Sequence, residues 1–202
     1  NYLQVSEDDT SVRLSTNVLF GVQSVYMKQD RLTGMYCDYA MAAPLMLADK
    51  KPSDMDVLIL GMGTGTYAVK DHLNEDGVMV VNMNMRGSGD GNINQYLSDT
   101  IGQVFDAEYT VDVANTTNRE LFASNNPSIM ENLQANTKQI TNADLRNMME
   151  TVYADSTPYG KGDYILTDDK APVELLGMQV IDQLIGEEVA YYKGIYERDG
   201  IQ

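Results

Sequence analysis

The residues best suited to chemistry are the glycines in the stretch "VLILGMGTGTYA". Gly61, Gly63 and Gly65 follow a short apolar run, with Thr64 between the last two. Glycine lets a backbone approach a ligand closely, and a helix that begins after the turn offers unpaired amides to a polar or anionic group. The stretch therefore predicts a ligand-binding loop between a strand and a helix. The alternative is a turn with a purely structural role.

The spacing of this loop favours a nucleoside over a dinucleotide. A dinucleotide fingerprint has a further glycine at the sixth position, where the helix packs closely, and this chain has Thr66 there. The compact G-x-G-x-G form is more typical of nucleosides such as S-adenosylmethionine. A carboxylate that holds the ribose is expected at the end of the next strand, about twenty residues on. That strand ends with Asn82 and Asn84 and has no acid, so part of the expected site is missing.

The amino-acid composition limits the kinds of molecule that this chain is expected to bind. The 202 residues include 30 acidic and 14 basic side chains, giving a formal charge of -16. Nucleic acid is not expected as a ligand, because neutralising phosphates requires clustered Lys and Arg, which this sequence does not have. An acidic surface suits a cationic partner, although the charge could serve solubility alone.

The single cysteine and the distribution of apolar residues indicate the compartment. Cys37 cannot form a disulfide framework, so a reducing, cytoplasmic setting is expected, with Cys37 buried. It has no second Cys or His that would complete a metal site, and no metal is expected. No apolar run reaches the roughly eighteen residues of a membrane span.

The periodicities predict an α/β layer fold with mainly parallel strands, because strands and helices alternate through the middle of the chain. Antiparallel strands are expected in residues 1–33, and a helix interrupted by Pro44 is expected around residues 35–46. Further strands are expected at 57–61, 78–85, 107–113 and 118–124, and further helices at 66–73, 93–105, 128–136, 143–153 and 178–196. Asn142 is the expected cap of the helix at 143–153, and the helix at 178–196 carries an apolar stripe expected to pack on a core.

These elements group into three predicted units. Residues 1–33 form an N-terminal β-lobe. Residues 34–126 form a nucleoside-binding domain. Residues 127–202 form a C-terminal helical extension that packs on it.

Several segments in this order resemble one family. They are "GVQSVYMKQDRLTGMYCDYAMAAPLML", "DVLILGMGTGTYA", "LNEDGVMVVNMN", "NRELFAS" and "LTDDKAPVE". Together they resemble spermidine synthase-like proteins, the polyamine aminopropyltransferases, and most closely a bacterial branch whose soluble domain is often fused behind membrane helices. The resemblance implies a methyltransferase-like Rossmann domain behind a small β-lobe. It also implies transfer of an aminopropyl group from decarboxylated S-adenosylmethionine to a polyamine such as putrescine.

The resemblance assigns roles to individual residues. Gln23 and the loop residues Gly61, Gly63, Thr64 and Gly65 fall on the nucleoside or donor site. Tyr36 and Asp38 fall on positions that bind the amine. Two departures weaken donor recognition: Thr64 stands where synthases usually carry an aspartate, and Asn1 stands where many members have glutamine.

The largest departure is a missing interval. In the family, several strands and helices separate the glycine loop from the "GVLVVN" strand, and they carry the ribose-binding acid and the catalytic aspartate. Here "GTGTYA" runs directly into "VKDHLNEDG". Either this sequence is only part of a longer polypeptide, or the Rossmann domain is truncated in the middle by a real deletion. The catalytic residue is unknown.

Three functions stay open at this point: an aminopropyltransferase, a catalytically inactive remnant that acts as a binding or interaction domain, and a methyltransferase on the shared fold. A homo-oligomer and an upstream membrane segment also stay open.

Overall fold

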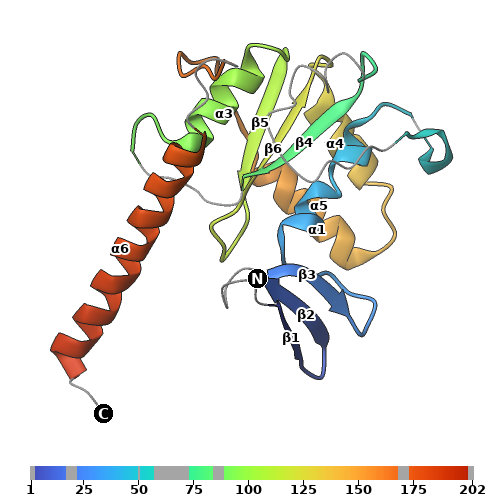
Figure 1. Cartoon of the computed structure of the whole chain (residues 1–202). Coiled ribbons are helices and arrows are strands. Elements are labelled where there is room, and N and C mark those ends of the chain that lie inside the picture. Colours follow the sequence, from blue (N-terminus) through green and yellow to red (C-terminus); the bar gives the residue numbers. More distant parts are fainter. Residues whose placement is uncertain are drawn as a thin grey trace.

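The computed structural model describes residues 3–16, 22–49, 51–56, 73–83, 89–167 and 173–199 (Figure 1). The glycine loop, the strand expected at 57–61 and the helix expected at 66–73 lie outside these described residues. Within them the chain is a mixed α/β protein with two antiparallel sheets, and its helices lie before, between and after the strands of the second sheet in sequence.

The N-terminal lobe is a three-stranded antiparallel sheet, as predicted. Its strands are β1 (Leu3–Glu7), β2 (Ser11–Thr16) and β3 (Val22–Met27), paired in that order. The β1–β2 turn is closed by Asp8, whose Oδ1 accepts hydrogen bonds at 2.7 Å from the backbone amides of Thr10 and Ser11.

The second sheet has the order β4-β6-β5-β7, and every neighbouring pair in it is antiparallel. Its strands are β4 (Val78–Met83), β5 (Ala107–Asp112), β6 (Arg119–Ser124) and the short β7 (Thr157–Pro158). Parallel neighbours were predicted, and for these strands that prediction is wrong. The chain passes from β4 through α3 (Ile93–Gly102) into β5, which runs in the same direction as β4. The next strand, β6, forms a hairpin with β5 and lies between β4 and β5, antiparallel to both.

Both faces of this sheet are buried, because its strands alternate apolar residues on either side. One face packs against α1 (Tyr36–Ala40), the 3-10 helix η1 (Ala43–Met46), α4 (Ile129–Thr137) and α5 (Ala143–Asp155). The other face packs against α3 and the turn after it. Phe122 on the first face and Leu121 on the second are both fully buried.

The helices on the first face are held by asparagine side chains. The helix predicted across residues 35–46 is broken at the expected place, with Pro44 in the first turn of η1. The Asn132 amide donates to the carbonyl of Met46 at 3.0 Å, and Asn136 donates to that of Leu45 at 2.8 Å. Asn142 caps α5 as predicted, accepting from the amide of Leu145 at 3.0 Å.

On the second face, α3 anchors the loop between β7 and α6 through the buried Asp99. This carboxylate accepts from the Tyr159 hydroxyl at 2.8 Å and from the Tyr164 amide at 2.9 Å. Gly162 lies against it so closely that a β-carbon there would collide with the carboxyl group. Burial and the bond to Asp99 both raise the pKa of the Tyr159 phenol, so Tyr159 remains a donor.

The last helix, α6 (Val173–Asp199), departs from the expected packing. Its first turns contact α3, and the rest projects away from both sheets (Figure 1). Leu176 is buried, whereas Met178, Ile185 and Val189 are exposed. The prediction that the apolar stripe packs on a core is therefore wrong for the described part of this single chain, because the helix axis leads away from the sheet.

The Asp99 anchor gives a stability prediction. Tyr159→Phe removes one hydrogen bond to a buried carboxylate, so we expect the free energy of unfolding to fall by about 1.5–3 kcal/mol. Hydrogen exchange should rise at the backbone amides of residues 159–166. Tyr153→Phe on α5 is the control, because no hydrogen bond of its hydroxyl is found within the described residues. This variant should lower the free energy of unfolding by less and leave hydrogen exchange at residues 159–166 unchanged. Equal exchange in both variants would contradict the anchoring role.

Candidate functional site

Polar groups gather on the α1 side of the sheet where β4 ends. Asn82 is the penultimate residue of β4, and its Oδ1 accepts from the Asn118 side chain at 2.9 Å. Glu120 on β6 is the register partner of both Asn82 on β4 and Val111 on β5. Asn82 and Glu120 therefore lie on the same face, and with Asn118 they form what we call the β4-end cluster.

Helix α1 reaches the same end of the sheet. The hydroxyl of Tyr39 accepts a hydrogen bond at 3.1 Å from the amide of Ala114, in the hairpin between β5 and β6. Asp38, the preceding residue, is also buried, and its Oδ2 accepts from the amide of Gly34 at 2.6 Å. This bond fixes the turn that enters α1, where φ of Gly34 is 76°.

Glu120 is the least expected group in the cluster. It is fully buried, and neither carboxylate oxygen has a hydrogen-bond partner among the described residues. Burial raises its pKa to about 8, so the protonated form dominates at neutral pH. An ammonium group close to a buried carboxyl would favour the charged form, so the site is chemically suited to an amine cation.

A second buried glutamate lies on the opposite face. Burial is the largest cause that raises the pKa of Glu108 to about 8, and the charge of Asp99 adds to it, while Ser98 lowers it. This acid adjoins the loop anchor described above. Like those of Glu120, both of its carboxylate oxygens lack a hydrogen-bond partner among the described residues.

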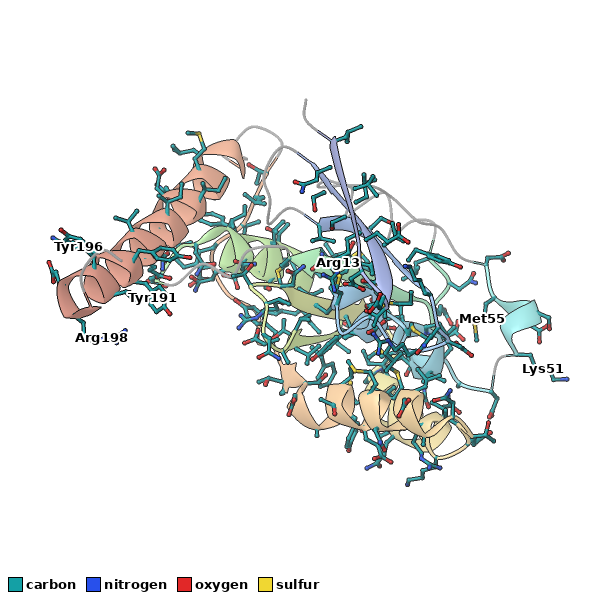
Figure 2. All side chains as sticks on the ribbon, turned by 90° about the horizontal axis from the view of Figure 1, so that it is seen from below. Arg13, Lys51, Met55, Tyr191, Tyr196 and Arg198 are labelled. Carbon is teal, nitrogen blue, oxygen red and sulfur yellow. The ribbon has the colours of Figure 1, made fainter. Side chains whose placement is uncertain are left out.

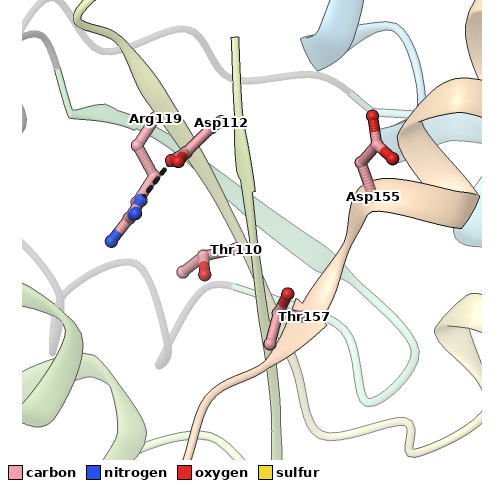
Figure 3. A pocket seen from close by; sticks show the side chains of 5 residues that line it. All are labelled: Thr110, Asp112, Arg119, Asp155 and Thr157. Carbon is pink, nitrogen blue, oxygen red and sulfur yellow. Dashed lines mark hydrogen bonds and ion pairs between the residues drawn. The ribbon is translucent and has the colours of Figure 1, made fainter.

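The cavity in Figure 3 lies at the other edge of the sheet. It encloses about 210 Å³ between β5, β6 and the end of α5. Asp112 and Arg119 form an ion pair across it at 2.6 Å, and Asp155 and the hydroxyl-bearing Thr110 and Thr157 complete the lining. No residue predicted for the nucleoside or amine site lies among these five.

The structure places only some of the predicted site residues. Tyr36 and Asp38 lie together at the start of α1, with Tyr36 half-buried against the core and Asp38 buried. Gln23 lies in β3, but its side chain is outside the described part, as are Gly61, Gly63, Thr64 and Gly65. Cys37 is exposed, contrary to the expected burial, because α1 turns it away from the sheet while Asp38 and Tyr39 face inward.

The sequence contains a signal for the two buried glutamates, which are not among the predicted site residues. In "NRELFAS", Glu120 stands two residues before Phe122 and therefore points to the same face of a strand. In "AEYTVDV", Glu108 and Val111 are three residues apart and therefore point to opposite faces of the sheet. Val111 lies on the α1 face, and Glu108 lies on the α3 face. An acid at an inward-facing position of a strand that is covered on both faces is an unusual placement that indicates a special role.

These observations define the class first: a mixed α/β protein with one buried acid, Asp38, in its first helix and another, Glu120, beside the end of the buried strand β4. A comparison with curated proteins then gives a relative, "Probable polyamine aminopropyl transferase" from Bifidobacterium longum (strain NCC 2705). It is 38% identical, and the alignment covers 99% of this chain and 65% of the relative. The predicted resemblance to polyamine aminopropyltransferases is confirmed by this similarity.

The alignment also supports the missing interval. It extends over 295 positions, whereas this chain has 202 residues, so at least 93 aligned positions have no counterpart here. Because 99% of the chain is aligned, these positions lie between aligned residues. No family model matches the chain, and no solved structure matches it.

Two further findings concern the described residues alone. None of their helices combines the length and apolarity that crossing a membrane requires. Nor do they bring together three or more His, Cys, Asp or Glu side chains in an arrangement able to hold a metal ion.

Glu120 gives a prediction about pH. Its folded-state pKa, about 8, lies above the 4.5 of the exposed group. Between these values the unfolded chain releases a proton that the folded chain keeps, so this residue lowers the free energy of unfolding as pH rises through the window. In Glu120→Gln the side chain no longer titrates, so the variant does not lose stability in this way. Its free energy of unfolding, relative to that of wild type, should rise by on the order of 1 kcal/mol per pH unit between pH ~5 and ~7.5.

Urea denaturation of both proteins at several pH values measures this difference directly. Glu150→Gln is the matched control, because Glu150 is exposed on α5. A stability difference between Glu120→Gln and wild type that stays constant with pH would contradict the raised pKa.

Proposed function

We propose that this chain is an aminopropyltransferase-type protein that transfers an aminopropyl group from decarboxylated S-adenosylmethionine to a polyamine such as putrescine. The observation that carries the proposal is the 38% identity across 99% of the chain to the probable polyamine aminopropyl transferase. The chain covers 65% of that relative, so the relative's activity enters as part of the proposal.

The acids at the β4 end support an amine substrate. A polyamine is a chain of ammonium groups, and each group needs a carboxylate or several acceptors when it leaves water. Asp38 and Glu120 are both buried on the α1 side of the sheet. The formal charge of -16 would also raise the local concentration of a polycation.

The proposed roles follow the resemblance. Gly61, Gly63, Thr64 and Gly65, with Gln23, bind the nucleoside of the donor, within a Rossmann-like domain at residues 34–126. Tyr36 and Asp38 bind the acceptor amine. An amine attacks only after it has lost its proton, and in this proposal the residue that takes the proton is not assigned.

A catalytically inactive binding domain is the second candidate. The specific observation that favours it is that at least 93 positions of the alignment have no counterpart in this chain. According to the resemblance, the interval missing after the glycine loop contains the family's catalytic aspartate. A chain without it would keep the amine site and lose the transfer step.

The two candidates separate in one experiment with purified protein. Methylthioadenosine and putrescine, each at millimolar concentration, are tested for a rise in melting temperature, since a ligand that binds the folded chain raises its stability. Mass spectrometry then tests for spermidine after incubation with putrescine and decarboxylated S-adenosylmethionine. Formation of spermidine supports the transferase. Thermal stabilisation without spermidine supports the binding domain. If neither stabilisation nor spermidine is found, both candidates are rejected.

Asp38 provides the variant test. Asp38→Asn keeps an oxygen that can accept from Gly34 but removes the charge, so the fold should remain while the shift caused by putrescine falls by at least half. Asp144→Asn, at an exposed position in the first turn of α5, is the control and should keep the full shift. A full putrescine shift in Asp38→Asn would remove this residue from the amine site.

A further inference from the structure

The cavity in Figure 3 is built on the α3 face of the second sheet. Thr110 on β5 pairs with Leu121, which packs on that face, and Asp112 follows two residues later, so both β5 side chains point the same way. Arg119 on β6 is the register partner of Asp112, and Thr157 on β7 is that of Thr110. Three neighbouring strands thus bring an acid, a base and two hydroxyl groups to one place.

Several of these groups have unused hydrogen-bonding capacity. Thr110 is only 8% exposed, and its hydroxyl has no hydrogen-bond partner among the described residues. The exposed Thr157 hydroxyl, at the rim, likewise has none within the part of the chain that the structure describes. A hydroxyl group removed from water without a partner costs free energy that a polar ligand would recover. The floor of the cavity therefore favours a polar ligand.

At one end of the cavity, Arg119 is suited to bind a carboxylate. Its Nε donates to Asp112 at 2.6 Å, and its terminal nitrogens donate to none of the described residues. A guanidinium group has five N–H donors in a planar fork, and its terminal nitrogens fit both oxygens of a carboxylate. The bond to Asp112 fixes the fork through Nε and leaves its terminal edge for a ligand.

At the other end, Asp155 is suited to bind a cation. It is the last residue of α5, where the helix dipole places partial negative charge, and the last turn of α5 has no basic residue. Its carboxylate has no ion-pair partner among the described residues. An ammonium group beside it would offset the charges of both the side chain and the helix end. In Figure 3, Asp155 stands apart from the ion pair, and Thr110 and Thr157 lie between them.

The mixture of charges selects the class of ligand. A purely cationic ligand would be repelled by Arg119, and a purely anionic one by Asp112 and Asp155. A zwitterion places each of its charges against an opposite one. The cavity encloses about 210 Å³, and sites for drug-sized ligands typically enclose roughly 300–1,000 Å³. The ligand is therefore small.

The cavity is open to solvent on the side of Asp155 and Thr157, which are both exposed. Among the described residues, none from α6 contributes to its lining. Figure 2 shows Tyr191 and Tyr196, on the outer half of that helix, far from the sheets. A small solute can therefore enter without displacing a described helix.

We propose that this cavity binds a small zwitterion with one ammonium and one carboxylate group, the chemistry of a free amino acid. Arg119 binds the carboxylate and Asp155 binds the ammonium group. The hydroxyl groups of Thr110 and Thr157 bind the atoms between them. This site is separate from the proposed amine site, whose buried acids lie on the α1 side of the sheet.

Calorimetric titration of the purified chain tests the proposal. The probes are glycine, β-alanine and 4-aminobutanoate, in which the ammonium and carboxylate groups are increasingly far apart. Propylamine and propanoate are the controls, because each carries only one of the two charges. At least one zwitterion should bind at millimolar concentration and about tenfold more tightly than either control, because each charged hydrogen bond adds to the affinity. Absence of binding by all three zwitterions, or equally tight binding of either control, would overturn the proposal.

Variants locate the binding site. Asp155→Asn removes the charge at the end of α5 and should weaken binding of the zwitterion about tenfold. Glu150→Gln changes another exposed acid of the same helix and should leave binding unchanged. Asp38→Asn, at the proposed amine site, should also bind normally. Unchanged binding in Asp155→Asn, or loss of binding in Asp38→Asn, would overturn the proposal. These titrations use neither a polyamine nor a nucleoside, so their outcome is independent of the proposed transferase activity.

Discussion

The arrangement of the second sheet depends on the antiparallel insertion of β6 between β4 and β5. Every residue from Glu120 to Ser124 is buried, because strands lie on both sides and helices cover both faces. The register that joins β6 to its neighbours also places Glu120 between Asn82 and Val111. The same pairing therefore builds the core and removes one carboxyl group from water.

The two buried glutamates differ in their neighbours. Glu108 adjoins Asp99, whose hydrogen bonds hold the loop after β7, but both of its own carboxylate oxygens lack hydrogen-bond partners within the described residues. Glu120 adjoins amide side chains and the first helix, and both its oxygens lack hydrogen-bond partners within the described residues. A buried acid with unused acceptors costs free energy that the fold alone does not recover. A bound amine would recover it, which is why Glu120 supports the proposed substrate class.

Local signals in the sequence predicted the elements better than their pairing. The asparagine cap before α5, the break at Pro44 and the two strands of the β5–β6 hairpin depend on residues close in sequence, and all were predicted. The hairpin's place between β4 and β5 depends on contacts distant in sequence, and alternation of strands and helices wrongly suggested parallel neighbours. The apolar stripe of α6 was identified correctly, but periodicity cannot tell whether such a face meets the same chain or another. Of the site, Tyr36 and Asp38 came from the resemblance, whereas Glu120 required knowledge of which strands surround it.

The described residues leave parts of the second sheet and of α6 without a neighbour. Among the described residues, β4 has a hydrogen-bonded neighbour on one side, and α6 has a covered face only near its first turns. A chain that lacks an interval of its relative's sequence has less apolar area to bury within itself, and smaller domains bury a smaller fraction of their surface. Ligand binding at the β4 end would stabilise the folded chain, because a ligand that binds only the folded state favours that state.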